Sequence, residues 1–366
     1  MAGHLMAQVV DSVWSERDTS PAAIEAALRA LMTERQRGEL GAQPARALNL
    51  VCVVDGAWSG EVANRLRGVG RLHASRTVVC SVESGPSTRT QLDARVSVTG
   101  SARGDAPLVR ETVVVSVGEQ HLRHLDTIVD PLVVTDVATV VWAPHGHPEA
   151  LDALTTRLAG GPPIAQVVLT DSLDEPDPRA ALERVGALAR RAYVVDLSWL
   201  RSTPWRERVA AAFDPPARRP ELRRLAGVTV RHRRDSGVAA LLLAGWLAAR
   251  LGWRPAPLLR DGDTLTGRLT SRQGDVRVRL EPDARMAVPG LCAIALHGTS
   301  GGSLELSRGT GGLRARRTDR TGAQRTWTVL GASRGEPGIL GEGLRQALLR
   351  DPIFAEALGA ARELAG

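Results

Sequence analysis

The sequence predicts an α/β protein, α+β overall: an N-terminal layered α/β domain with a mixed sheet, and a C-terminal α+β domain with an antiparallel meander. Three observations support this. Apolar, β-branched runs alternate with helical stretches as far as residue 195. Short alternating runs split by glycine turns follow between residues 264 and 328. Charge also divides, with 19 arginines against 24 acidic residues over 1–200 and 28 against 16 over 201–366.

The N-terminal half is predicted from apolar periodicity. We expect a flexible leader over residues 1–19, and then a helix that begins at Pro21 after Ser20. Strands are expected over residues 47–55, 77–82, 92–99, 109–117, 137–142, 165–170 and 193–195, and helices over 61–73, 119–129, 151–158 and 178–192.

The C-terminal half begins where Thr203 can cap a helix and Pro204 can be its first residue, since the missing N–H of proline costs nothing there. A strand over 228–232, a buried helix over 237–251, meander runs at 267–270, 276–280, 291–296, 303–306 and 326–329, and a terminal helix over 343–364 follow. We place the domains at residues 20–195 and 196–366.

Composition excludes several kinds of chemistry. All 47 basic residues are arginines. Without lysine there is no P-loop lysine, no Schiff-base or pyridoxal lysine and no kinase-type phosphate lysine. No signal peptide is recognised, and the most apolar run, residues 238–253, is too short to span a bilayer. We expect a soluble, cytoplasmic protein.

Gly68-Val-Gly70 is the nearest approach to a dinucleotide-binding fingerprint. It closes a predicted helix instead of following a strand, and no third glycine stands at the required spacing. We interpret it as a helix C-cap and predict no cofactor.

Two histidine pairs are candidate metal ligands. His121 and His124 lie on a predicted helix with Asp126 nearby, and His145 and His147 follow a predicted strand. Zinc needs three or four such groups that converge. Nothing in the sequence brings the two pairs together, so we predict no metal site.

Cys52, Cys80 and Cys292 are too few and too widely spaced for a disulfide framework. Cys52 and Cys80 lie on strands that we expect to be neighbours. A redox pair is therefore an alternative to the buried, apolar thiols that we favour.

The segment 201–234 holds ten arginines and three acidic residues. It fits a nucleic-acid contact, a docking surface for an acidic protein or sugar phosphate, or a solvated basic face. Few aromatics interleave the arginines, which disfavours stacking on single strands. Because no nucleophile, acid/base pair or cofactor loop is evident, the residues alone favour a binding or regulatory protein.

The stretch Asp196-Leu-Ser198-Trp199-x-Arg201-x-x-x-Trp205-Arg206 resembles the signature of the glucose-6-phosphate dehydrogenase assembly protein family, OpcA. Other segments resemble family motifs in the same order: Leu48-Asn-Leu-Val, His73-Ala-Ser75-Arg76, Pro131-Leu-Val-Val-Thr-Asp136, Val140-Val-Trp142-Ala-Pro144, Asp171-Ser172, Asp177-Pro178 and Leu241-Leu-Leu-Ala-Gly245-Trp246-Leu. Ala74 replaces a proline of the family pattern.

The resemblance implies a non-enzymatic partner of glucose-6-phosphate dehydrogenase, the NADP-dependent first enzyme of the oxidative pentose phosphate pathway. Such a partner promotes the active oligomer of the dehydrogenase or activates it allosterically. A metal- or sugar-phosphate-binding enzyme and an arginine-rich nucleic-acid-binding protein stay open as alternatives.

The signature also suggests roles for single residues. We expect Trp205 to pack into the core and Asp196 or Ser198 to fix the start of the helix, which leaves Trp199, Arg201 and Arg206 as candidate partner contacts. The remaining motif residues, expected to be structural, are Arg76, Asp136, Trp142, Asp171, Ser172 and Trp246.

Overall fold

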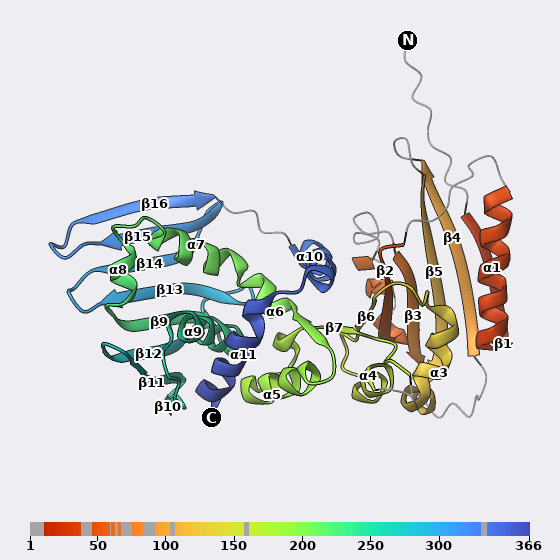
Figure 1. The fold of residues 1–366 in the computed structure, drawn as a ribbon, viewed down its shortest axis with the longest axis horizontal. Helices are drawn as coiled ribbons and strands as arrows, with labels where there is room; N and C mark the ends of the chain where they lie inside the picture. Colours follow the sequence, from red (N-terminus) through yellow and green to blue (C-terminus); the bar gives the residue numbers. More distant parts are fainter. Residues whose placement is uncertain are drawn as a thin grey trace, which may run out of the picture. The chain divides into compact units, whose positions relative to one another are not determined.

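The computed structural model describes residues 11–37, 46–58, 60–62, 65–66, 75–83, 92–102, 107–156, 161–330 and 335–366. The chain folds into two compact units, drawn in Figure 1. Unit 1 is Met1–Thr170, Arg190–Val195 and Glu336–Leu349, and unit 2 is Asp171–Ala189, Asp196–Gly335 and Arg350–Gly366. Each unit is built on an eight-stranded sheet with helices, which confirms the predicted α/β class.

The sheet of unit 1 has the order β1-β4-β5-β3-β2-β6-β7-β8. Its strands are β1 (Asp11–Thr19), β2 (Leu48–Asp55), β3 (Ser75–Glu83), β4 (Leu92–Ala102), β5 (Pro107–Gly118), β6 (Thr139–Trp142), β7 (Val167–Thr170) and β8 (Tyr193–Asp196). The pairs from β5 through β3, β2 and β6 to β7 are parallel, whereas β1, β4 and β5 pair antiparallel. The central parallel strands are apolar runs because both of their faces are buried.

The helices of unit 1 are α1 (Pro21–Arg37), α3 (Leu125–Val129), α4 (Pro148–Thr155) and α10 (Gly335–Leu349), with short 3-10 turns at Gly56–Trp58, Glu119–His124 and Asp130–Leu132. Helix α1 packs against β4 through Ile24, Leu28 and Met32, which recur every fourth residue and are buried. Most of the helix predicted over 61–73, with Gly68 and Gly70, lies outside the described residues.

Residues 11–19, predicted as part of a flexible leader, form β1 and pair with β4 from Asp11–Thr99 to Thr19–Leu92, and residues 1–10 lie outside the described residues. Only Val13 and Trp14 are apolar in this strand. An edge strand needs few buried side chains, so apolar periodicity does not reveal it.

The sheet of unit 2 has the order β10-β11-β12-β9-β13-β14-β15-β16. Its strands are β9 (Leu225–Arg233), β10 (Leu259–Asp261), β11 (Thr264–Ser271), β12 (Gly274–Asp283), β13 (Leu291–Gly298), β14 (Ser303–Gly309), β15 (Gly312–Thr318) and β16 (Gln324–Leu330). Neighbours pair antiparallel except β12 and β9, which are parallel. The predicted meander is therefore interrupted by β9. The prediction also misses two strands of this sheet, β10 and the arginine-rich β15.

The helices of unit 2 are α5 (Pro178–Ala189), α6 (Leu197–Arg201), α7 (Thr203–Phe213), α8 (Arg219–Leu222), α9 (Gly237–Leu251) and α11 (Pro352–Ala365). Helix α9 is buried along most of its length and packs on α11, α5 and the sheet. No helix in the described ranges is both long and apolar enough to cross a membrane.

The single terminal helix predicted over 343–364 is divided into α10 and α11. Arg350 has a positive φ of 54°, and Asp351 then caps α11 by accepting a hydrogen bond from the Ile353 amide at 2.8 Å. Pro352 cannot continue a helix but suits a first helical position. The two helices belong to different units, and the chain also changes unit after residues 170, 189, 195 and 335.

Candidate functional site

Asp196 is the first residue of the signature stretch (residues 196–206). It ends β8 and is only 1% exposed. Its Oδ1 accepts hydrogen bonds from the amides of Ser172 and Ser198, both at 3.0 Å. The bond from Ser198 caps α6, and the bond from Ser172 ties that helix to a segment 24 residues earlier.

This carboxyl group lies in an unusually costly environment. Asp196 Oδ2 and the hydroxyls of Ser172 and Ser198 are buried without a hydrogen-bond partner among the described residues. Burial and the neighbouring charge of Asp171 raise the pKa of Asp196 to about 6, against the opposing effect of the two amide bonds. Asp196 is therefore partly protonated under mildly acidic conditions.

Asp171 holds the neighbouring part of the cluster. Its carboxylate accepts from the Leu173 amide at 3.2 Å, which caps a short 3-10 turn, and pairs with the Arg201 guanidinium at 2.7 Å. The Arg201 and Asp171 side chains are only 20% and 12% exposed, so solvent screens this ion pair little.

Trp199 contacts the start of α11. Its side chain is 2% exposed, and its Nε1 donates to Asp351 Oδ2 at 2.8 Å. The indole lies 5.5 Å from the Phe354 ring, centroid to centroid. On the indole face, the Arg206 guanidinium carbon lies 3.4 Å from the ring centroid, a cation–π contact.

Arg206 is a buried cation that is held by oxygens. It donates to Ser202 Oγ at 3.1 Å, to Thr203 Oγ1 at 2.9 Å and to the Trp199 carbonyl at 3.3 Å. Burial lowers the pKa of Arg206 to about 10, opposed by the charges of Asp351 and Glu207. It remains charged at neutral pH.

The three residues predicted to contact a partner protein, Trp199, Arg201 and Arg206, bind other residues of this chain instead. Trp199 and Arg206 are 2% and 9% exposed, and Arg201 is bound to Asp171. Contact between these residues and a partner stays a prediction. Trp205 is 3% exposed, and Ser202, not Thr203, stands at the N-cap position of α7.

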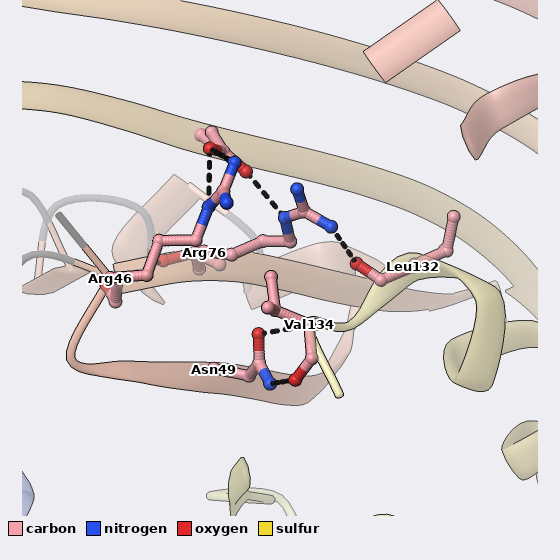
Figure 2. A network of polar contacts seen from close by, with 8 residues as sticks. Arg46, Asn49, Arg76, Leu132 and Val134 are labelled. Atoms are coloured by element: carbon pink, nitrogen blue, oxygen red, sulfur yellow. Dashed lines mark hydrogen bonds and ion pairs between the residues drawn. The ribbon is translucent and has the colours of Figure 1, made fainter. Parts of the chain in front are cut away.

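A second polar cluster lies in unit 1 and is drawn in Figure 2. The Glu111 side chain is 2% exposed and accepts from Arg46 at 2.5 Å and from Arg76 at 2.5 Å. Arg76 also donates to the Leu132 carbonyl at 3.2 Å. The motif arginine thus ties β3, β5 and the turn before β6 together.

Asn49 completes this cluster from β2 (Figure 2). Its side-chain amide donates to the Val134 carbonyl at 2.8 Å and to Thr139 Oγ1 at 3.0 Å, and its Oδ1 accepts from the Val134 amide at 3.0 Å. A fully buried amide needs such partners. The asparagine inside an apolar run is the one sequence signal for it.

The other motif residues lie apart from both clusters. Trp142 is 2% exposed on β6, and Trp246 is 8% exposed on α9. Asp136 is exposed in a turn before β6. Sequence reasoning does not foresee the roles of Glu111, Asp351 and Phe354, since their partners lie far away along the chain.

The sheet of unit 1 reverses its order at β2, because β3 lies on one side of it and β6 on the other. The crevice outside the carboxyl ends at such a point is the usual ligand site of open α/β sheets. Asp55 is the last residue of β2 at this point of the sheet, and its Oδ1 lies 2.9 Å from His147 Nε2. The Asp55 amide donates to His145 Nδ1 at 3.1 Å, and burial lowers the pKa of His145. A carboxylate and two imidazoles thus occupy this position, where dinucleotide-binding folds carry a glycine-rich loop.

The two histidine pairs have different local partners. His121 Nδ1 accepts from the Gly118 amide at 3.2 Å, whereas His145 and His147 contact Asp55. Within the described ranges, no group of three His, Cys, Asp or Glu side chains is arranged to hold a metal ion.

The three cysteines are free thiols. Cys52 pairs in register with Val79, and Cys80 pairs with Val53. Successive residues of a strand point to opposite faces, so the two thiols lie on different faces of the sheet, which does not support a redox pair. Burial raises the pKa of both, that of Cys80 to about 12. Cys292 is half-buried, and its Sγ donates to Asp283 at 3.4 Å.

The structure is that of a two-unit α/β protein, in which each unit is built on one eight-stranded sheet. The polar residues of its signature stretch bind one another. Two family models match, which describe the N-terminal domain and the C-terminal domain of a glucose-6-phosphate dehydrogenase subunit. The first covers residues 67–187 and the second covers residues 192–358. The chain belongs to the glucose-6-phosphate dehydrogenase assembly protein family, OpcA.

Three curated cyanobacterial relatives carry the printed name "Putative OxPP cycle protein OpcA". The match is 30% identical over 51% of this chain for Synechococcus elongatus, 31% over 38% for Nostoc punctiforme and 30% over 37% for Synechocystis sp.. The matched regions cover 40%, 30% and 28% of those proteins, so less than half of each relative is represented.

A solved structure shares the fold. Glucose-6-phosphate 1-dehydrogenase from Mycobacterium avium superposes with a TM-score of 0.53 over 87% of this chain and 91% of that one, at 10% identity.

Proposed function

We propose that this chain is a non-catalytic partner of glucose-6-phosphate dehydrogenase that favours the active oligomer of the enzyme and so acts as its allosteric activator. Membership of the OpcA family carries the proposal. The names of the cyanobacterial relatives, which place them in the oxidative pentose phosphate cycle, agree with it.

Two features of the site support a role without catalysis. The polar side chains of the signature stretch, among them Asp196, Trp199 and Arg206, bind one another and the start of α11. At the carboxyl ends of β2 and β3 lie the carboxylates of Asp55 and Glu83. A Cβ added to Gly56 would lie 3.1 Å from the Glu83 carboxylate. Negative charge at this place opposes binding of a pyrophosphate, which needs backbone amides and a helix N-terminus.

An activator of this kind acts by population shift. If it binds the active oligomer more tightly than the other states, it raises the population of that oligomer by the affinity difference. Linkage then requires substrate and activator to tighten each other's binding by the same factor, typically about 5- to 150-fold.

The test uses the purified chain and the dehydrogenase of the same organism. We expect co-elution, a shift of the dehydrogenase toward its larger oligomer in light-scattering chromatography, and a higher rate at limiting glucose 6-phosphate. The dissociation constant of the pair should fall when glucose 6-phosphate is added. Absence of binding, with no change in rate or oligomer distribution, would refute the proposal. Oxidation of NADPH or reduction of NADP⁺ by the chain alone would refute its non-catalytic part.

A further inference from the structure

The sheet of unit 2 has two unlike faces. One is covered: Val276, Val278 and Leu280 of β12 are buried beneath α9, which packs on β9 and β12. Arg317 of β15 lies on the same face, where it contacts Phe213 of α7 and Glu221 of α8. The residues between the buried ones point the other way.

The opposite face, which we call the open face, is rich in arginine. Residues paired across strands share a face, so the register identifies its members. Its charged residues are Arg231, Arg233, Arg268, Arg277, Arg279, Arg314 and Arg316, with Asp261, Asp275, Glu281, Asp283 and Glu305. Seven positive charges therefore stand against five negative ones. The Arg268, Arg279 and Arg316 side chains are 72%, 56% and 52% exposed.

The charges on this face are balanced only in part. Glu305 pairs with Arg231 and Arg316, Glu281 pairs with Arg279, and Asp235 pairs with Arg233. Arg268 and Arg277 stand directly opposite each other on β11 and β12, an arrangement of like charges that weakens a sheet. Asp275 lies 3.8 Å from Arg268, but Arg277 and Arg314 form no ion pair with any described residue. Carboxylates supplied from outside would relieve this repulsion.

Apolar side chains mark both edges of the open face. Leu259 of β10 is 73% exposed and Leu330 of β16 is 79% exposed. Leu259 pairs with Thr266, which in turn pairs with Arg279, so Leu259 lies on the open face. Leu330 stands two residues after Thr328, which pairs with Arg314, so Leu330 lies on the open face as well. Covering an exposed leucine removes its apolar surface from water, so each of these two side chains would add an apolar contact to the charged face if a partner covered it.

The size and relief of the face suit a protein interface. Small residues, Gly227, Ala295, Ser303 and Ser307, lie across its centre, and the His297 side chain lies against Gly227. Eight strands spaced about 4.8 Å apart, with about 3.3 Å per residue, span roughly 34 by 25 Å, or about 850 Å². A standard interface buries about 800 Å² on each partner.

The chemistry of the face selects the kind of occupant. Five carboxylates among the arginines would repel the continuous phosphates of a nucleic acid, and Trp327 lies on the covered face with Ala315. His297 offers a single imidazole on the open face, which is too few rings for a run of stacked bases. A second copy of the same face would bring arginines together. A folded protein with an acidic surface meets both the excess charge and the exposed leucines.

We propose that the open face of the unit 2 sheet is the docking surface for an acidic face of glucose-6-phosphate dehydrogenase, with Arg277 and Arg314 as its main charged contacts. The inference rests on the function proposed above. It moves the partner contact from the buried Trp199 and Arg206 to side chains that solvent can reach.

The test compares two double charge reversals in the full chain. Arg277→Glu with Arg314→Glu changes the open face at residues without an ion pair among the described residues, and Arg219→Glu with Arg250→Glu makes the same change of charge on the exposed sides of α8 and α9. We expect the first variant to bind the dehydrogenase at least tenfold more weakly and the second within twofold of wild type. Leu259→Ser with Leu330→Ser should also weaken binding, with little dependence on salt, whereas wild-type binding should weaken as salt rises.

Circular dichroism and urea unfolding keep the result interpretable, because only variants that fold like wild type are compared. If wild type binds and both open-face variants bind equally well, this surface is wrong and the proposed function stands. If wild type does not bind at all, the proposed function falls and the surface with it. Tight binding of duplex DNA that Arg277→Glu and Arg314→Glu abolish, while binding of the dehydrogenase is unchanged, would assign the face to nucleic acid instead.

Discussion

Trp199 Nε1 donates a hydrogen bond to Asp351 Oδ2 at 2.8 Å, across 152 residues of sequence. Asp351 also caps α11 through the Ile353 amide. One carboxylate therefore fixes the start of the last helix and binds the indole of the signature stretch. The pair makes Trp199 a residue of the architecture of unit 2, whatever else it does.

The first prediction concerns this indole. Trp199→Ala should cost about 3 to 5 kcal/mol of stability, since it leaves a large cavity beside Phe354 and removes a hydrogen bond to the half-buried Asp351 carboxylate. Trp199→Phe should cost less, about 1 to 2 kcal/mol, because it keeps most of the packing and loses the hydrogen bond. Urea unfolding measures both.

The matched control is Trp58→Ala in unit 1, because the Trp58 side chain is 53% exposed. We expect this change to stay within about 0.5 kcal/mol of wild type. If Trp199→Ala were as mild as Trp58→Ala and still bound the dehydrogenase weakly, Trp199 would be a partner contact after all.

The second prediction concerns pH. Burial raises the pKa of Asp196 to about 6, whereas an unfolded aspartate titrates near 4. The folded state then holds the proton more tightly, so the stability that this group contributes is full below about pH 4 and is lost as pH rises through 6. Relative to Asp196→Asn, wild type should lose up to about 3 kcal/mol between pH 4 and pH 7.5.

Urea titrations of both proteins at several pH values check this, with the exposed Asp136→Asn as control. The control should track wild type at every pH. A constant difference between wild type and Asp196→Asn would show that the carboxyl titrates normally.

The sequence predicts elements better than it predicts partners. Helix α9 falls where its apolar run places it, from Gly237 to Leu251, because the periodicity of a buried helix is local information. Strand β15 escapes prediction because arginines alternate with small residues along it. The insertion of β9 between β12 and β13 is a non-local pairing that no local pattern records.

The candidate site shows the same limit. The signature stretch identifies the family, and the cap at Asp196 follows from the residue type. The sequence does not say that Trp199 is buried, because its cover comes from Asp351 and Phe354 after most of unit 2 has intervened. Exposed and buried arginines also look alike in sequence, although Arg206 lies inside and Arg277 outside.

The third prediction concerns the cluster in unit 1. Glu111→Gln should cost about 3 kcal/mol, since it keeps the shape of the side chain but leaves the Arg46 and Arg76 charges without their shared buried counter-ion. Hydrogen exchange of the amides in β3 and β5 should accelerate. Glu149→Gln is the control, because its pair with Arg123 is 48% and 76% exposed and should contribute under about 1 kcal/mol. Equal effects of the two changes would show that Glu111 is effectively solvated.

The fourth prediction compares the effects on stability of replacing two glycines of unit 2, Gly245 and Gly359, with alanine. A Cβ on Gly245 of α9 would lie 2.5 Å from the Ala357 carbonyl oxygen and 2.7 Å from the Ala361 amide, both backbone atoms of α11. Gly245→Ala should therefore force the helices apart and cost at least about 2 kcal/mol. Gly359→Ala, on α11 itself, meets nothing within 4 Å and should stabilise the protein by about 0.5 to 1 kcal/mol through helix propensity. Thermal or urea unfolding must then give opposite signs for the two variants, and the same sign for both would mean that α9 and α11 do not cross this closely.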